Sequence, residues 1–141
     1  MGLRRKAREA AMQFLFAIDA NKEKEYSEYL ELFCDDFEIN EDIIPFFRDT
    51  VNGVLQYKSE IDSLIERFSE HWKVYRMSRV DRNLLRISVY ELIYRDDIPS
   101  VVSINEAIDI GKRFGTKDSG SFINGLLDKI KNNINELKQK E

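Results

Sequence analysis

The residues best suited to chemistry in this sequence are the cations close to its N-terminus. Four of the five residues from Arg4 to Arg8 are Arg or Lys, yet the whole chain carries a formal charge of −4. Removing these four from its 22 basic residues leaves 18 against 26 acidic residues. A cationic cluster on an acidic protein predicts a local task, and phosphate binding suits it. A solvated helix end without a ligand is the alternative.

An aromatic ring follows these cations at helical spacing. Steps of three and four residues put one stripe of side chains on the same side of a helix: Arg5, Arg8, Met12 and Phe16. Phosphate contacts beside a ring suit single-stranded RNA, whose bases stack on aromatic side chains. A second interpretation, in which Phe16 belongs to the core, stays open at this point.

A search for catalytic groups gives little. Cys34 is the only cysteine and His71 the only histidine, and each lies in an ordinary amphipathic context without a partner. No glycine-rich phosphate loop is present, and no apolar run approaches the ~18 residues that span a bilayer. We therefore expect no enzyme, no metal, no cofactor and no membrane contact, in a reducing, cytoplasmic setting.

Helical periodicity runs through the N-terminal half. Apolar residues at helical steps predict helices over residues 3–20, 26–37, 40–55 and 59–68. Pro45 fits the first turn of the third helix, where its missing N–H costs nothing. Ser59 and Asp62 resemble a start signal for the fourth. Residues 21–49 are strongly acidic, so we expect this region to repel phosphate.

The C-terminal half predicts three more helices. An aromatic and basic connection over residues 71–77 leads into a long helix over residues 80–95, which carries apolar residues on more than one stripe and should be the most buried. A narrower stripe of Arg82, Arg86 and Tyr90 either pairs with acidic residues inside the fold or faces a partner.

Start and stop signals delimit the last two helices. Ser103 and Glu106 have the spacing of a capping box, and Gly115 ends that helix. Asp118 or Ser119 caps the last helix. Gly125 inside it costs roughly 1 kcal/mol relative to Ala, so we expect a close approach of another backbone there. No strand pattern is present, and the prediction is one all-α domain with about seven helices.

Several short motifs occur in the order and at the spacing of a known family: Val80-Asp81-Arg82-Asn83-Leu84-Leu85-Arg86-Ile87, Tyr90-Glu91-Leu92, Asp97-Ile98-Pro99, Ile104-Asn105-Glu106-Ala107 and Phe122-Ile123-Asn124-Gly125-Leu126-Leu127-Asp128. Together with the basic N-terminal cluster, they resemble the NusB family of bacterial transcription antitermination factors. The resemblance implies two packed helical bundles in one compact domain of residues 1–141, about 3–70 and about 78–137.

The resemblance also implies a ligand and partners. It implies binding of boxA RNA, notably in ribosomal RNA leaders, with the ribosomal protein NusE as heterodimer partner, and loading onto RNA polymerase with other Nus factors. The implied RNA-binding residues are Arg4, Arg5, Lys6, Arg8, Phe16, Phe114, Lys117, Asp118, Ser119 and Phe122. The implied NusE surface includes Tyr75, Val80, Arg82 and Arg86. Some relatives dimerise when free, and the sequence does not decide whether this chain forms a homodimer.

Three positions depart from the family pattern. Ser121 stands where a Lys or Arg is common, Ile110-Gly111 replaces the more usual pair of small residues, and Phe16 lacks the hydroxyl of a Tyr. Two other functions compete with the RNA-binding factor. Some ribosomal RNA cytosine methyltransferases contain a similar helical domain, but they need a further α/β domain, for which we expect no room in 141 residues. The other is a protein-interaction domain without an RNA role.

Overall fold

The computed structural model describes residues 2–21, 26–36, 40–70 and 72–134. Seven α-helices and one short 3₁₀ helix, and no strand, occur in these residues: α1 (Leu3–Asn21), α2 (Ser27–Asp36), α3 (Ile44–Gln56), α4 (Lys58–Phe68), η1 (Val74–Arg76), α5 (Arg79–Tyr94), α6 (Ser100–Phe114) and α7 (Ser119–Asn132). The all-α prediction with about seven helices is therefore confirmed. The predicted second helix extends to Phe37, which lies outside the described residues, as does His71.

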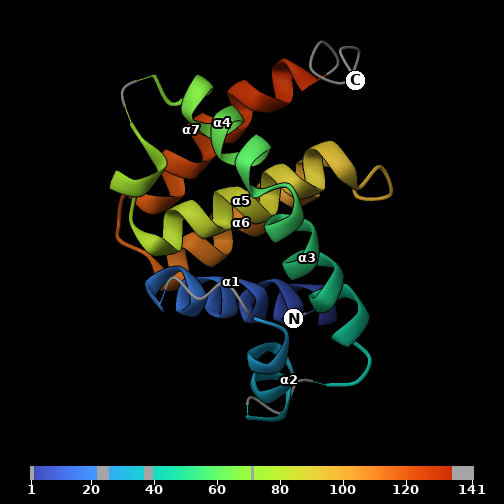
Figure 1. Cartoon of the computed structure of the whole chain (residues 1–141). Coiled ribbons are helices and arrows are strands. Elements are labelled where there is room, and N and C mark those ends of the chain that lie inside the picture. The colour runs from blue at the N-terminus through green and yellow to red at the C-terminus, as the bar shows by residue number, and fades with distance from the viewer. Residues whose placement is uncertain (1, 22–25, 37–39, 71, 135–141) are drawn as a thin grey trace.

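Helix α5 forms the centre of the fold (Figure 1). It contacts α1, α3, α4, α6 and α7, and every residue from 83 to 92 is buried. The prediction that this helix is the most deeply buried is confirmed. Helix α1 packs across it beside α3, while α6 and α7 pack on each other and both contact α5. Helix α4 packs on both α5 and α7, and the division into bundles at residues 3–70 and 78–137 stays a prediction.

Some predicted helix boundaries hold, and others have a different physical cause. Pro45 lies in the first turn of α3, as expected. The start signal at Ser59 is wrong, because α4 begins at Lys58 without a side-chain cap and Asp62 instead accepts hydrogen bonds from Arg86 at 2.8 and 3.0 Å. Ser78 supplies an unpredicted cap of α5, where its hydroxyl accepts from the amide of Asp81 at 3.0 Å.

The predicted capping box in α6 is also wrong. Helix α6 begins at Ser100, so Ser103 and Glu106 lie inside it rather than at its start. Ser103 is buried and its hydroxyl donates to Glu91 at 2.6 Å. The i, i+3 spacing of a capping box also places two side chains on one face of a helix, and here that face meets α1 and α5.

The close approach expected at a glycine of α7 is found instead at a glycine of α6. Gly125 is exposed, and a Cβ added there would meet no atom within 4 Å, so the predicted close approach at this residue is wrong. Gly111 is buried, and its Cβ would lie 2.8 Å from Cδ1 of Ile123. The family departure at Gly111 therefore lets α6 approach α7 closely. Among the described helices, none is long and apolar enough to cross a membrane.

Candidate nucleic-acid interface

The cations of α1 divide into a buried group and an exposed group. Arg8 has only 3% of its surface exposed, and its guanidinium donates to both carboxylate oxygens of Glu91 at 2.8 and 3.0 Å. A third hydrogen bond, of 3.1 Å, joins Arg8 to Glu106. All of these contacts lie inside the fold, so Arg8 holds α1 against α5 and α6.

Arg5 lies one turn before Arg8 and also faces α6. Its guanidinium donates to Glu106 and, at 2.9 Å, to Asp109. The hydrogen bond to Glu106 is the main cause that raises the pKa of Arg5 above its ordinary value, against the partial burial that lowers it. The side chain keeps 20% of its surface exposed, so a phosphate reaching Arg5 meets a cation that is already neutralised by two carboxylates.

Arg4 and Lys6 are exposed, and neither has an ion pair with another described residue. The Arg4 guanidinium lies over the ring of Phe46, 4.7 Å from its centroid. Such a cation–π contact at an exposed site contributes about 0.5–1 kcal/mol, which leaves the guanidinium able to move to an anion. These two residues are the cations of the α1 cluster that have no ion pair among the described residues.

Phe16, near the other end of α1, is a surface residue. Its side chain has 38% of its surface exposed, so the alternative in which it belongs to the core is excluded. The guanidinium of Arg79, the first residue of α5, lies 5.7 Å from the ring centroid. A ring with a cation beside it offers a stacking surface and a phosphate contact together. Arg79 was not predicted from the sequence, because only the folded chain brings the start of α5 to Phe16.

The turn between α6 and α7 lies at the end of the molecule where α1 finishes and α5 begins (Figure 1). Phe114 and Phe122 are half-buried there, while Lys117 and Asp118 are exposed. Ser119 is buried, and its hydroxyl accepts from the amide of Thr116 at 2.9 Å. Ser119 therefore shapes the turn from inside, and Lys117 supplies its exposed cation.

The residues predicted to contact NusE are also partly inside the fold and partly on its surface. Arg86 is buried between Asp62 and Asp19, and Arg82 donates to Asp19 at 2.6 Å. Partial burial would raise the pKa of Asp19, but the hydrogen bond from Arg82 and the nearby charges of both arginines outweigh it and lower that pKa. Of the two interpretations of this stripe, pairing inside the fold is the one found.

Two aromatic side chains remain on the surface beside this buried network. Tyr75 in η1 has 71% of its surface exposed, and Trp72, which was not among the predicted site residues, has 54%. Val80, in the first turn of α5, is half-buried and packs against the core. Large exposed rings on a soluble protein mark an interaction surface when they occur together. The sequence showed that both residues lie in a short aromatic and basic connection. It did not show that their rings are exposed.

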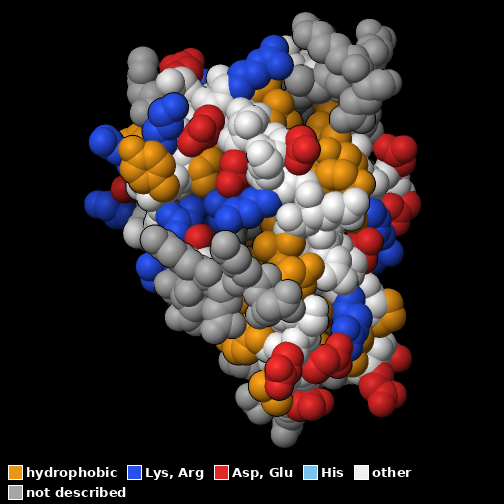
Figure 2. Space-filling model, viewed as in Figure 1, with side chains coloured by type: hydrophobic (Ala, Val, Ile, Leu, Met, Phe, Trp, Pro, Cys, Tyr) orange, Lys and Arg blue, Asp and Glu red, His pale blue; other side chains and the backbone are white. Residues whose placement is uncertain are grey.

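Charge is unevenly distributed over the molecule (Figure 2). Acidic side chains gather around α2 at the lower end of this view, and basic side chains gather on its upper left, next to exposed hydrophobic ones. Helix α2 contains four acidic residues: Glu28, Glu31, Asp35 and Asp36. The acidic α2 end would therefore repel the phosphates of a nucleic acid.

The geometry defines a small all-helical protein with exposed cations and rings at the ends of α1 and no cluster of metal-ligating side chains among the described residues. A family model described as NusB family matches residues 5–132. The chain belongs to the NusB family, as the resemblance in the sequence predicted.

Named relatives agree with this membership. A transcription antitermination protein NusB from Desulforapulum autotrophicum is 54% identical over 133 residues, which cover 93% of this chain and 92% of that protein. The NusB structure from T. maritima is 37% identical, with a TM-score of 0.86, over 98% of this chain and 97% of that one. A crystal structure of the antitermination factors NusB and NusE in complex with dsRNA matches at 28% identity, with a TM-score of 0.83, over 94% of this chain and 98% of that one.

Proposed function

We propose that this chain is a non-enzymatic transcription antitermination factor that binds boxA-type single-stranded RNA together with NusE. The observation that carries the proposal is the similarity over nearly the whole chain to proteins named for transcription antitermination. The exposed cations Arg4 and Lys6 and the exposed ring of Phe16 support it, since both suit an RNA strand. A methyltransferase has less support, because a relative named for transcription antitermination matches over 93% of this chain and 92% of its own length.

The proposed RNA surface uses the exposed members of the implied set. Arg4 and Lys6 supply cations at one end of α1, and Lys117 supplies one from the α6–α7 turn, at the end of the molecule where α1 finishes. Arg4 and Phe16 are twelve positions apart, or about 18 Å along the helix axis. Arg5 keeps a weaker role as a partly neutralised cation. Arg8 and Ser119 support this surface from inside.

The strand that we propose is single rather than double. The related NusB–NusE complex contains dsRNA. However, a base inside a duplex cannot place its face on the ring of Phe16, whereas an unpaired base can. A cation surface that reads only the shape of the backbone would instead accept a duplex equally well.

Neutralising Lys6 and Lys117 together is expected to weaken binding of boxA-type RNA about tenfold. Each contact with a single-strand phosphate contributes about 0.7 to the slope of log affinity against log salt, so two lost contacts should reduce that slope by about 1.4. The measurement is fluorescence anisotropy of labelled RNA over a salt series with the Lys6→Ala/Lys117→Ala variant.

A matched control removes two other exposed lysines. Lys58 begins α4 and Lys131 lies near the end of α7. The Lys58→Ala/Lys131→Ala variant has the same net charge and should bind almost as the parent does. Equal losses in both variants would reduce the effect to net charge and contradict the site. A duplex of the same sequence that binds as tightly as the single strand would contradict the proposed strand.

For the NusE surface, we propose that Tyr75 and Trp72 are the anchors beside Val80. Aromatic residues that become desolvated dominate binding energy at protein interfaces. The buried network of Arg82, Arg86 and Asp19 holds the start of α5 against α1 below this surface. Arg82 also donates to the carbonyl oxygens of Tyr75 and Met77, so the same network fixes the backbone of η1.

Replacing Tyr75 by alanine is expected to weaken NusE binding by at least tenfold, because 71% of its surface is available for burial against a partner. Isothermal titration calorimetry with purified NusE measures this. Leu32→Ala is the matched control, since Leu32 is 53% exposed on α2, at the acidic end. NusE binding that is unchanged in Tyr75→Ala would remove η1 from the interface.

The proposal extends to assembly with RNA polymerase and the other Nus factors, which the RNA and NusE would bring together in the cytoplasm. A homodimer of the free protein would compete with this assembly if it covered Phe16. Sedimentation of the free protein with and without RNA tests that competition, because RNA should then shift a dimer towards the monomer.

A further inference from the structure

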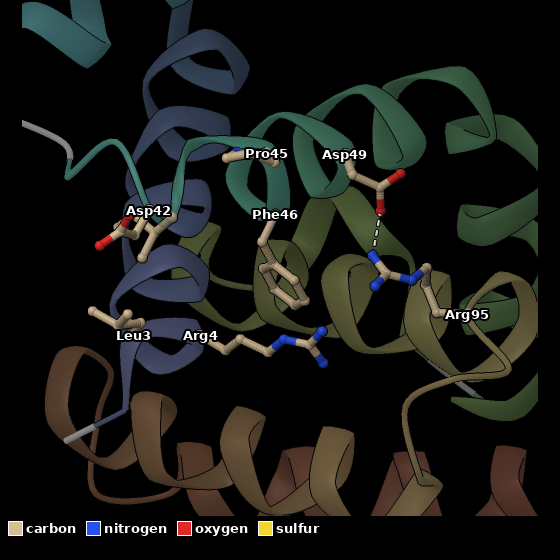
Figure 3. Close-up of a pocket in the computed structure, with 8 residues that line it drawn as sticks. Leu3, Arg4, Asp42, Pro45, Phe46, Asp49 and Arg95 are labelled. Carbon is tan, nitrogen blue, oxygen red and sulfur yellow. Dashed lines mark hydrogen bonds and ion pairs between the residues drawn. The ribbon is translucent and has the colours of Figure 1, made fainter.

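A hollow of about 570 Å³ lies beside the N-terminal end of α1 (Figure 3). It falls within the range of 300–1,000 Å³ that small-molecule sites occupy in proteins. Three elements supply its lining: the start of α1, the start of α3 with the turn before it, and the end of α5. The lining residues are Leu3, Arg4, Asp42, Ile43, Pro45, Phe46, Asp49 and Arg95.

The ring of Phe46 points into this hollow between the side chains of Arg4 and Arg95 (Figure 3). The Arg95 guanidinium lies 5.2 Å from the ring centroid and is fixed by ion pairs with Asp49 at 2.6 Å and Asp97 at 2.8 Å. The Arg4 guanidinium lies 4.7 Å from the same centroid and has no ion pair within the described chain. The buried Arg8 guanidinium also lies 5.1 Å from this centroid and is fixed by its ion pair with Glu91. Two of the three cations beside the ring are thus fixed, and Arg4 can move.

The charges of the lining balance, with two arginines and two aspartates. An isolated phosphate group would meet Asp42 and Asp49 as well as the cations, so the hollow does not suit an anion alone. Apolar surface is prominent instead, because Leu3 and Pro45 are exposed and Phe46 is half-exposed. A flat, uncharged ring with a polar edge matches this combination of an aromatic face and surrounding charges.

Arg4 also links this hollow to the cations of the proposed RNA surface. It lines a second hollow of about 440 Å³, which it shares with Gly2, Arg5 and the start of α6 around Val102. A strand held by Arg4 therefore has an aromatic platform within reach of its next base.

We propose that Phe46 is a stacking platform for one unpaired nucleobase of the bound RNA, with Arg4 moving from the ring to a phosphate of the same strand. This inference rests on the proposed RNA-binding function and adds a base-binding subsite at the end of α1 opposite to Phe16. Stacking of a base on an aromatic side chain contributes about 1–3 kcal/mol and tolerates any base.

Two variants test the subsite by anisotropy with boxA-type RNA. Phe46→Leu removes the platform and should weaken binding about tenfold. Leu3→Trp fills the hollow from an exposed position without removing packed atoms, so it should give a similar loss with an unchanged unfolding midpoint. Leu32→Trp, on the exposed surface of α2, is the matched control and should bind RNA as the parent does.

A direct readout separates the subsite from general weakening. RNA with 5-iodouridine at each pyrimidine position in turn should crosslink, at one position only, to the peptide that contains Phe46, and Leu3→Trp should abolish this crosslink. If Leu3→Trp binds RNA like Leu32→Trp and no crosslink reaches Phe46, the subsite is overturned while the proposed function stands. If Leu3→Trp impairs NusE binding and not RNA binding, the occupant is a protein and the inference fails. If the parent binds no boxA-type RNA, the proposed function and the subsite fail together.

Discussion

Replacing Glu91 by alanine is expected to reduce the free energy of unfolding by about 3–5 kcal/mol, because it leaves the guanidinium of Arg8 buried without its main counter-ion. Glu91 has 1% of its surface exposed and Arg8 has 3%. The carboxylate accepts two hydrogen bonds from Arg8 and one from Ser103. The substitution therefore leaves three donor groups without their acceptor. Urea denaturation followed by circular dichroism measures the loss.

Two further variants separate this cause from a general effect of the substitution. Lys129→Ala removes one partner of an exposed ion pair with Glu70, at 3.3 Å, and should leave the unfolding midpoint nearly unchanged. Arg8→Met combined with Glu91→Leu should recover at least half of the loss, because apolar side chains of similar size replace a buried ion pair at little cost. A stable Glu91→Ala single variant would contradict a buried, charged pair.

The burial of Arg8 limits which α1 variants can test RNA binding. An Arg8→Ala variant leaves Glu91 buried without its cation, so weak RNA binding by that variant reports on folding as much as on phosphate contacts. Lys6 and Lys117 avoid the problem, since both are exposed and neither has an ion pair within the described chain. A comparison of unfolding midpoints is therefore part of any assay that changes an arginine of α1.

The sequence was sufficient for most of the fold, because helix formation depends on local periodicity. The apolar steps of α1 and α5 gave their bounds to within a residue or two, and the crowded apolar stripes of α5 gave its central place. Pro45 lies in the first turn of α3 for a reason confined to its own backbone, which is its missing N–H. Gly115 ends α6 where an added Cβ would overlap the side chain of Ser119, so its reason lies partly in the next helix.

The candidate site was harder to predict, because its partners are distant in the sequence. Arg8 and Glu91 are 83 positions apart, and Arg5 and Glu106 are 101 apart. Periodicity places Arg5 and Arg8 on one stripe but does not say whether that stripe meets water or a carboxylate. For the same reason, the sequence did not identify Phe46 as a site residue. The cations beside its ring come from α1 and α5 and not from its own helix.

Replacing Gly53 by alanine is expected to reduce the free energy of unfolding by about 1–3 kcal/mol, because a Cβ there would overlap the ring of Tyr90. The ring cannot move aside cheaply, since its hydroxyl donates to Asp49 at 3.0 Å and Asp49 is bound to Arg95. Thermal and urea unfolding measure the effect. In a Tyr90→Ala background the overlap disappears, and the same substitution should become neutral or stabilising.

Gly125 supplies the opposite case within the same protein. It lies inside α7, and a Cβ at this position would meet only open space. Gly125→Ala is therefore expected to stabilise the protein by up to about 1 kcal/mol, through helix propensity alone. Gly53 and Gly125 are both helical glycines, so the sign of each substitution depends on the neighbouring helix. If Gly125→Ala proved as damaging as Gly53→Ala, α7 would have to pack through Gly125 against a partner.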